Sequence, residues 1–227
     1  MHQGDRLQAV SIIEGIKMGR KTQITREMIL KAAYELLDES GIGAVAIKTI
    51  AARLGCSTQP VSWQFGSMLE LKKELYDYSV KMLYGSLEED MKGKDAIDAF
   101  FISGIRYISG ACDHPNVFKF VNVEDPMVTI GERIGGDASI FSIQFDDEAA
   151  KMLESEYDIA PEKIGEMVRD IVIYTHGLAV MMMFDNYRLP KKDACIMVLN
   201  MGIRLAKNLG IEIDEKKRSK LLKQLDC

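Results

Sequence analysis

Apolar side chains recur every three or four positions along most of the chain, which is the period of an α-helix and not the alternation of a strand. The most regular apolar stripes occupy residues 25–40, 67–84, 96–111, 161–184 and 190–209. Proline and glycine cluster in residues 123–145 and predict a long loop or a set of short turns there. The pattern therefore predicts an all-α protein.

Residues 46–66 contain two short helical patterns, one on each side of a glycine. One apolar face of the first short helix is formed by Ile47, Ile50, Ala51 and Leu54. We expect Gly55 to end this helix in a left-handed conformation. Ser57 offers a hydroxyl to cap the next helix, and Pro60 fits in the first turn of that helix.

The second short helix would be held against the first by Val61 and Phe65, which lie four positions apart. A polar outer face then remains, formed by Thr58, Gln59, Ser62, Trp63 and Gln64. Two short helices with polar side chains displayed on the second form a helix-turn-helix, whose second helix fits the DNA major groove. The alternative is a plain helical corner with no role in DNA binding.

Several side chains of this segment have chemistry that suits DNA. The amides of Gln59 and Gln64 can pair with adenine edges. Lys48 and Thr49 begin the first short helix and could meet phosphates, although a solvated helix face is the alternative. Trp63, the only tryptophan, could pack on a thymine methyl or on the sugar-phosphate backbone, or could cover the local core. The predicted DNA-binding residues are Lys48, Thr49, Ser57, Thr58, Gln59, Ser62, Trp63 and Gln64.

The N-terminal third of the chain resembles the DNA-binding domain of the TetR/AcrR family of bacterial transcriptional repressors. The matching residues are Arg26, Ile29, Ala32, Ala33, Leu36, Leu37, Gly41, Ile50, Ala51, Leu54, Gly55, Ser57, Phe65, Ser67 and Leu71. A looser resemblance in residues 114–120 and 174–179 extends it to residue 210. The resemblance implies a homodimeric, ligand-responsive repressor that binds a palindromic double-stranded DNA operator and releases it when a small apolar effector binds.

Two positions depart from the family pattern. Members usually carry a tyrosine where this chain has Ser62, and a lysine where it has Met68. Both family residues commonly contact the DNA backbone, so the departures bear on DNA affinity more than on the fold. They leave open an alternative function, in which a helical dimeric adaptor keeps the fold, binds DNA weakly and acts through protein contacts.

The resemblance also implies a division of the chain into domains. Residues 18–66 would form the helix-turn-helix domain, residues 67–210 a larger effector-binding and dimerisation domain, and residues 211–227 a charged tail helix. Residues 1–17 have no counterpart in the family, and Met18 is a natural start. We expect residues 1–17 to be a translated leader from a misplaced start codon; a short N-terminal arm is the alternative.

The C-terminal helices supply candidates for effector binding and for dimerisation. The effector candidates are apolar, aromatic or thioether side chains that suit an adaptable pocket, namely Phe101, Ile105, Tyr174 and Met181. The last two long helices resemble the family's dimerisation pair, in which a residue without a side chain lets another helix approach closely. The interface candidates are Gly177, Leu178, Met182, Ile196, Leu199 and Ile203.

Charge and composition refine these predictions. The chain carries a net charge of −5, with nine Lys/Arg against seven Asp/Glu in residues 18–85 and eighteen against twenty-five in residues 86–227. The positive charge thus lies with the helix-turn-helix, where phosphate would be met. The longest apolar run, residues 178–184, is too short to cross a bilayer, and no secretion signal is recognisable, so we expect a cytoplasmic protein without a membrane partner.

Nothing in the sequence indicates catalysis. The four cysteines are scattered, and neither they nor the histidines have metal-ligand spacing. No nucleophile elbow, P-loop, zinc-protease motif or dinucleotide fingerprint is present. We therefore predict a protein that is not an enzyme and that requires neither a metal nor a cofactor.

Overall fold

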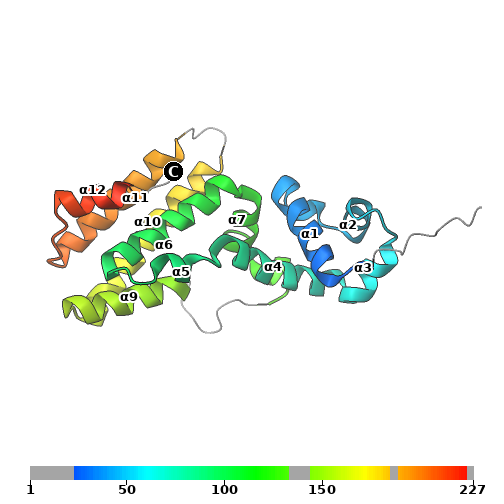
Figure 1. The fold of residues 1–227 in the computed structure, drawn as a ribbon, viewed down its shortest axis with the longest axis horizontal. Helices are drawn as coiled ribbons and strands as arrows, with labels where there is room; N and C mark the ends of the chain where they lie inside the picture. Colours follow the sequence, from blue (N-terminus) through cyan, green and yellow to red (C-terminus); the bar gives the residue numbers. More distant parts are fainter. Residues whose placement is uncertain (1–22, 133–143, 185–188, 224–227) are drawn as a thin grey trace, which may run out of the picture.

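The computed structural model describes residues 23–132, 144–184 and 189–223 (Figure 1). Within these ranges the regular secondary structure consists of helices, with no strand, which confirms the predicted all-α fold. Residues 1–17, interpreted above as a leader, lie outside the described residues.

The N-terminal part is built from short helices that surround a small core. Its elements are α1 (Arg26–Ser40), the 3₁₀ turn η1 (Ile42–Ala44), α2 (Ile47–Arg53), α3 (Thr58–Phe65) and α4 (Met68–Tyr84). The Thr25 hydroxyl caps α1 by accepting a hydrogen bond from Met28 N at 3.2 Å. The Ser67 hydroxyl caps α4 in the same way, from Glu70 N at 3.1 Å. These caps explain why both helices begin where they do.

The C-terminal part is a bundle of longer helices. Its elements are α5 (Leu87–Met91), α6 (Ala96–Asp113), α7 (Pro115–Asn122), α8 (Pro126–Thr129), α9 (Gln144–Tyr157), α10 (Pro161–Met182), α11 (Lys191–Asn208) and α12 (Glu215–Lys223). The long helices follow the predicted apolar stripes. The four-residue α8 lies within the segment predicted as loop or turns, because one turn of helix is too short to show a period.

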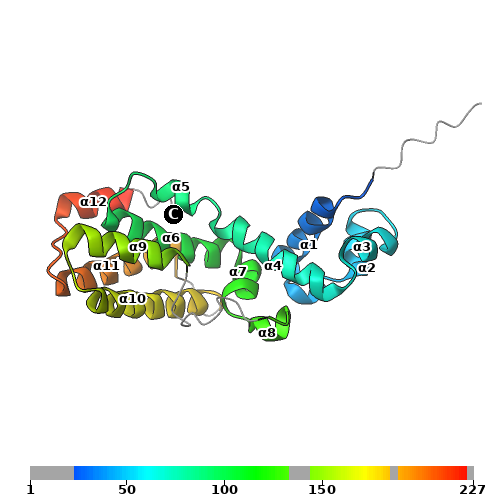
Figure 2. The same ribbon diagram turned by 90° about the horizontal axis from the view of Figure 1, so that it is seen from below.

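Helix α4 joins the two parts, running from the N-terminal helices into the bundle (Figures 1 and 2). One buried cluster continues along it, and includes Ile29 of α1, Leu75 of α4, Phe118 of α7 and Val198 of α11. A second cluster fills the space between α6, α9, α10, α11 and α12. The predicted domain boundary at residue 66 therefore does not coincide with a break in packing.

Ion pairs that include one buried carboxylate, that of Asp98, fasten the last helix, α12, to the start of α6. Asp98 of α6 is only 1% exposed, and its Oδ2 accepts a hydrogen bond from Lys220 Nζ at 2.6 Å. Its Oδ1 lies 2.7 Å from Lys217 Nζ, an ion pair without the alignment of a hydrogen bond. Lys217 also pairs with Asp95. Burial is the largest single influence on the pKa of Asp95 and raises it, but the hydrogen bonds from Lys217 and Asp98 N and the charges of Lys217 and Lys220 together outweigh burial and leave that pKa below its usual value.

Candidate nucleic-acid interface and ligand cavity

The turn between α2 and α3 has the predicted helix-turn-helix geometry. Gly55 has φ of +63°, so it ends α2 in the left-handed region that favours glycine. Ser57 occupies the N-cap position of α3, but its hydroxyl makes no capping hydrogen bond, contrary to the prediction. The physical reason is local: Pro60 stands at the third helical position, where a capping hydroxyl would normally find an N–H donor.

One face of helix α3 packs against the core, and the opposite face is exposed. Val61 and Phe65 are buried, as predicted from their spacing. Trp63 is 81% exposed, so it does not cover the local core. Thr58 and Gln59 are also exposed, whereas Ser62 is half-buried and its hydroxyl donates to the Thr58 carbonyl at 3.2 Å. The exposed face thus combines one large aromatic side chain with small polar ones.

The remaining DNA-binding candidates differ in how far their polar groups are engaged. Lys48 is exposed on α2. The Thr49 hydroxyl accepts from Ala46 N at 3.0 Å and donates to the Ala44 carbonyl at 2.7 Å, so it caps α2. The Gln64 amide donates to the Ile24 carbonyl at 3.2 Å. The Gln64 amide therefore holds the segment before α1 in place. The side chain of Gln59, in contrast, is exposed on this face of α3.

Arg26 fixes the orientation of α3 in a way that the sequence analysis missed. Its guanidinium lies over the Phe65 ring at 4.2 Å and donates to the Gln64 carbonyl. Its Nε also donates to Glu74 Oε2 at 2.7 Å. One side chain therefore ties α1 to the end of α3 and to α4. The available signal was an arginine in the first turn of a helix, where the macrodipole disfavours a cation unless a specific partner holds it.

A groove runs beside the exposed face of α3. It is lined by Gln23 and Ile24, by the α2–α3 turn, and by Gln59, Pro60 and Trp63. Met68, where the family usually has lysine, is half-buried against the core next to this face. The site therefore presents hydroxyl, amide and indole groups at the groove, with Lys48 as an exposed cation on α2.

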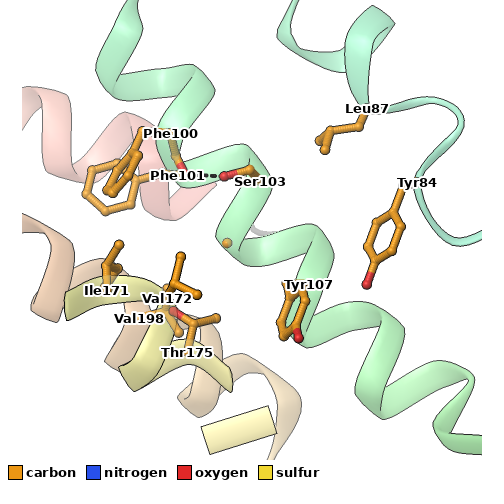
Figure 3. A pocket seen from close by; sticks show the side chains of 11 residues that line it. Tyr84, Leu87, Phe100, Phe101, Ser103, Tyr107, Ile171, Val172, Thr175 and Val198 are labelled. Atoms are coloured by element: carbon orange, nitrogen blue, oxygen red, sulfur yellow. Dashed lines mark hydrogen bonds between the residues drawn. The ribbon is translucent and has the colours of Figure 1, made fainter. Parts of the chain in front are cut away.

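A second candidate site is a cavity of about 40 Å³ inside the helical bundle (Figure 3). Its lining is predominantly apolar and aromatic, and consists of Tyr84, Leu87, Phe100, Phe101, Ser103, Gly104, Tyr107, Ile171, Val172, Thr175 and Val198. Of the predicted effector contacts, Phe101 lines this cavity, whereas Ile105 and Tyr174 are not part of its lining. Met181 does not line it either and is 44% exposed on the outward face of α10.

The polar groups near the cavity are engaged with one another. Ser103 Oγ donates to the Phe100 carbonyl at 2.8 Å. The Tyr107 hydroxyl lies 2.7 Å from His176 Nδ1, and burial lowers the pKa of His176. Tyr107 also stacks with Tyr84, the last residue of α4, with ring centroids 6.4 Å apart. The cavity is therefore joined by direct ring contact to the helix that leads to α3.

The predicted dimer interface divides into exposed and buried residues. Gly177 is exposed on α10, and no atom lies within 4 Å of where its Cβ would stand. Leu178, Met182 and Ile196 are half-buried against the core, and Ile203 against the second cluster. Leu199 is 0% exposed within one chain, so its place in an interface is corrected: its side chain faces inward and has no surface left to offer.

The outward face of α10 carries apolar residues that the sequence analysis assigned elsewhere or missed. Ile173, Gly177 and Met181 follow one another at four-residue spacing, and all are exposed. Phe184 continues this stripe, and Met197 on α11 is also exposed. The i, i+4, i+8 spacing of Ile173, Gly177 and Met181 indicates that they share one face of the helix. It does not indicate whether that face points inward or outward.

No cluster of three or more histidine, cysteine or carboxylate side chains among the described residues could hold a metal ion. No helix in the described ranges combines the length and apolarity that crossing a bilayer requires.

Residues 29–75 match the family described as "Bacterial regulatory proteins, tetR family". No curated protein matches the chain.

Similar solved structures share the fold at low identity. One is a transcriptional regulator from Rhodococcus sp. Rha1, with a TM-score of 0.59 and 14% identity over 84% of this chain and 100% of that one. A TetR variant from Acinetobacter baumannii AYE in complex with minocycline has a TM-score of 0.55 and 13% identity over 84% and 99%. NalD, the secondary repressor of the MexAB-OprM multidrug efflux pump in Pseudomonas aeruginosa, has a TM-score of 0.51 and 17% identity over 79% and 94%.

Proposed function

Because the chain belongs, through its N-terminal helices, to the tetR family of bacterial regulatory proteins, we propose that it is a ligand-responsive repressor that binds a palindromic operator as a homodimer. The observation that carries the DNA-binding part is the exposed face of α3, where Trp63 stands 81% exposed beside Gln59. A rigidly backed helix that displays indole, amide and hydroxyl groups has the chemistry to contact base edges and thymine methyls in a major groove.

The proposed dimer uses the outward stripe of α10 together with α11. Contiguous exposed apolar surface is a feature of interaction sites, and Ile173, Met181 and Phe184 form such a stripe around Gly177. Two copies of α10 and α11 would pack as a four-helix arrangement. Symmetric pairing there would place two copies of α3 about 34–36 Å apart, the spacing of successive major grooves on one side of DNA.

The proposed ligand response links the cavity to α3 through two contacts. The first is the ring contact of Tyr107 with Tyr84 at the end of α4. The second lies at the junction of α6 and α7, where His114 Nδ1 is 2.9 Å from Asp38 Oδ2 and Asn116 Nδ2 of α7 donates to the Asp38 carbonyl at 2.8 Å. A ligand that favours a different placement of α6 would shift α1 and α4, and with them the spacing of the two recognition helices.

A mobility-shift assay on DNA from immediately upstream of the coding sequence tests the DNA-binding part. Trp63→Ala should weaken the shift, because the indole contact with the groove is lost. Val128→Ala is the matched control, since Val128 is equally exposed at 81% but lies on α8, away from the proposed interface. Equal binding by wild type and Trp63→Ala would show that α3 is not the recognition element.

A second candidate function is a dimeric adaptor that acts through protein contacts. Two observations favour it: the Gln64 amide is engaged with Ile24, and Met68 offers the backbone no charge. A folded, dimeric chain that binds neither its upstream DNA nor fragments selected from the host genome would support the adaptor. In either function we propose a cytoplasmic, non-enzymatic protein without a cofactor, as is general for the family.

A further inference from the structure

We propose that the bundle cavity selects a small, uncharged ligand of one or two aromatic rings and excludes organic ions of the same size. This inference rests on the proposed ligand response, whose site it describes more closely. Figure 3 shows Phe100 and Phe101 facing Ile171 and Val172, with Tyr84 and Tyr107 toward the other end. Aromatic rings favour this kind of wall, because ring edges and faces can meet in offset or edge-to-face contacts.

The described lining offers no charged group that could pair with a charged ligand. Of the described residues that line the cavity, none carries a charge. The nearest basic side chain by sequence, Arg106, is paired with Asp90. The hydroxyls of Ser103 and Tyr107 are engaged with the Phe100 carbonyl and with His176. A carboxylate or ammonium would therefore lose its hydration shell without gaining a counter-ion, which is strongly unfavourable.

The size of the cavity sets a second limit. A volume of about 40 Å³ holds roughly three waters, at about 10–15 Å³ for each water. Any ring-sized ligand must therefore move part of the wall. One side resists movement, because a Cβ at Gly202 would lie 2.4 Å from the Phe101 ring and a Cβ at Gly104 would lie 3.1 Å from Val198. Helices α6 and α11 are already in close contact there.

The wall formed by Tyr84 and Leu87 is the one that leads toward the DNA-binding helices, and we expect the cavity to expand on this side. Tyr84 is the last residue of α4, and Leu87 begins the five-residue helix α5. Expansion on this side would act on α4 directly, whereas expansion toward α11 would break the close packing of α6. The geometry thus favours a small ligand and directs its effect toward the DNA-binding helices.

Calorimetry on the full-length protein without DNA tests the ligand class. The probes are benzyl alcohol, benzoate and benzylamine, which share one ring and are neutral, anionic and cationic at pH 7, and the two-ring 2-naphthylmethanol. We expect both alcohols to bind and each ion to bind roughly tenfold more weakly or worse, because its charge is left unpaired. Equal binding of the ions, or no binding of either alcohol, would overturn the proposal.

Two variants locate the binding and exchange its charge preference. Val172→Phe fills the cavity and should abolish binding of benzyl alcohol, whereas Val123→Phe, at an exposed position outside the cavity, should leave it unchanged. Ser103→Lys places a cation in the wall and should make benzoate the preferred probe. Loss of binding in both phenylalanine variants alike, or no gain for benzoate in Ser103→Lys, would place the ligand elsewhere.

A separate assay distinguishes failure of this inference from failure of the proposed repressor. The mobility shift is repeated with saturating benzyl alcohol and then with benzoate. Release of DNA by the alcohol alone supports both the ligand class and its regulatory role. Binding by calorimetry without release of DNA would refute the regulatory link but uphold the ligand class, whereas release by both probes equally would refute the ligand class.

Discussion

The two ends of the molecule expose apolar side chains in different ways. On α3 a single indole, Trp63, projects from a face of hydroxyl and amide groups. On α10 and just beyond its end, the exposed residues Ile173, Met181 and Phe184 follow one helical stripe that also includes Gly177. An isolated aromatic among polar groups suits a groove with mixed chemistry, whereas several apolar side chains on one stripe suit another protein surface. The difference assigns separate partners to the two ends.

The two ends of the molecule also differ in the ion pairs that hold their helices together. The N-terminal helices are tied together at the surface by Arg26, whose partners remain partly exposed. The C-terminal bundle instead holds the buried carboxylate Asp98 against two lysines of α12. Surface ion pairs contribute little because water screens them, whereas breaking a buried pair leaves an uncompensated charge. We therefore expect mutations at the two ends to differ in size.

The largest effect should come from salt acting on the N-terminal face. If the dimer makes about six to ten phosphate contacts, operator affinity should fall about 10³–10⁵-fold between 50 and 200 mM salt. Fluorescence anisotropy of labelled operator measures this slope. The dimer itself, held by apolar contacts, should show little change over the same range in light scattering. An operator affinity that does not change with salt concentration would show that α3 and its neighbours make no phosphate contacts.

The dimer stripe is tested by Gly177→Trp. Each chain has open space at this position, so the variant should fold, but the indole would hold two copies apart. We expect a monomer in light scattering and operator affinity lower by about 10²–10⁴-fold, since avidity from the second half-site is lost. The matched control is Gly165→Trp, which also points into open space on α10. A dimer that persists in Gly177→Trp would place the interface elsewhere.

The buried ion pairs of the bundle are tested by replacing Lys217 and Lys220 together with methionine. Asp98 is then left buried without a partner, which should cost about 3–5 kcal/mol of unfolding free energy in urea titrations. Adding Asp98→Asn should recover much of this loss, because the uncompensated charge is gone. Lys216→Met, at an exposed position of the same helix, is the control. Unchanged stability in the double variant would show that Asp98 gains water or another partner.

A smaller effect is expected from Arg26→Gln at the other end. Losing the contacts to Glu74 and to the Gln64 carbonyl should cost about 1–2 kcal/mol. If α3 must be reordered on DNA, the same free energy appears as roughly five- to thirtyfold weaker operator binding. Arg53→Gln removes the same charge but breaks contacts between α2 and α1 only. Equal losses of operator affinity in both variants would show that Arg26 contributes its positive charge and does not position α3.

The smallest effect should be the pH dependence of the Asp95 contact with Lys217. The pKa of Asp95 is lower in the folded state than in the unfolded chain, so its stabilising contribution is complete above the unfolded pKa of about 3.9. It is lost as the pH falls through the lowered folded value. Asp95→Asn keeps a side-chain oxygen that can cap α6 but loses the charge. Wild type should therefore unfold at higher urea than this variant at pH 6, and the difference should vanish in stronger acid.

Much of the fold and part of the candidate site could be predicted from the sequence, because the deciding interactions are local. Thr25 and Ser67 cap helices through N–H groups three residues away, and Gly55 ends α2 through its own φ angle. Val61 and Phe65 are buried as a four-residue spacing on a helix requires. A local error was the predicted cap at Ser57: the missing N–H of Pro60 is harmless to the helix itself, but it removes the donor that the Ser57 hydroxyl would have used.

The remaining features were decided by contacts between residues far apart in the chain. A helical pattern indicates which side chains share a face, but not which neighbour that face meets. Leu199 therefore fits the pattern of an interface residue, but its side chain is buried in the core of its own chain. Lys220 reaches Asp98 across 122 positions, and Phe101 reaches the cavity that Ile105 and Tyr174 do not line. Periodicity determined the helices and their faces, whereas the packing of those faces determined the cavity, the buried charges and the surface left for a partner.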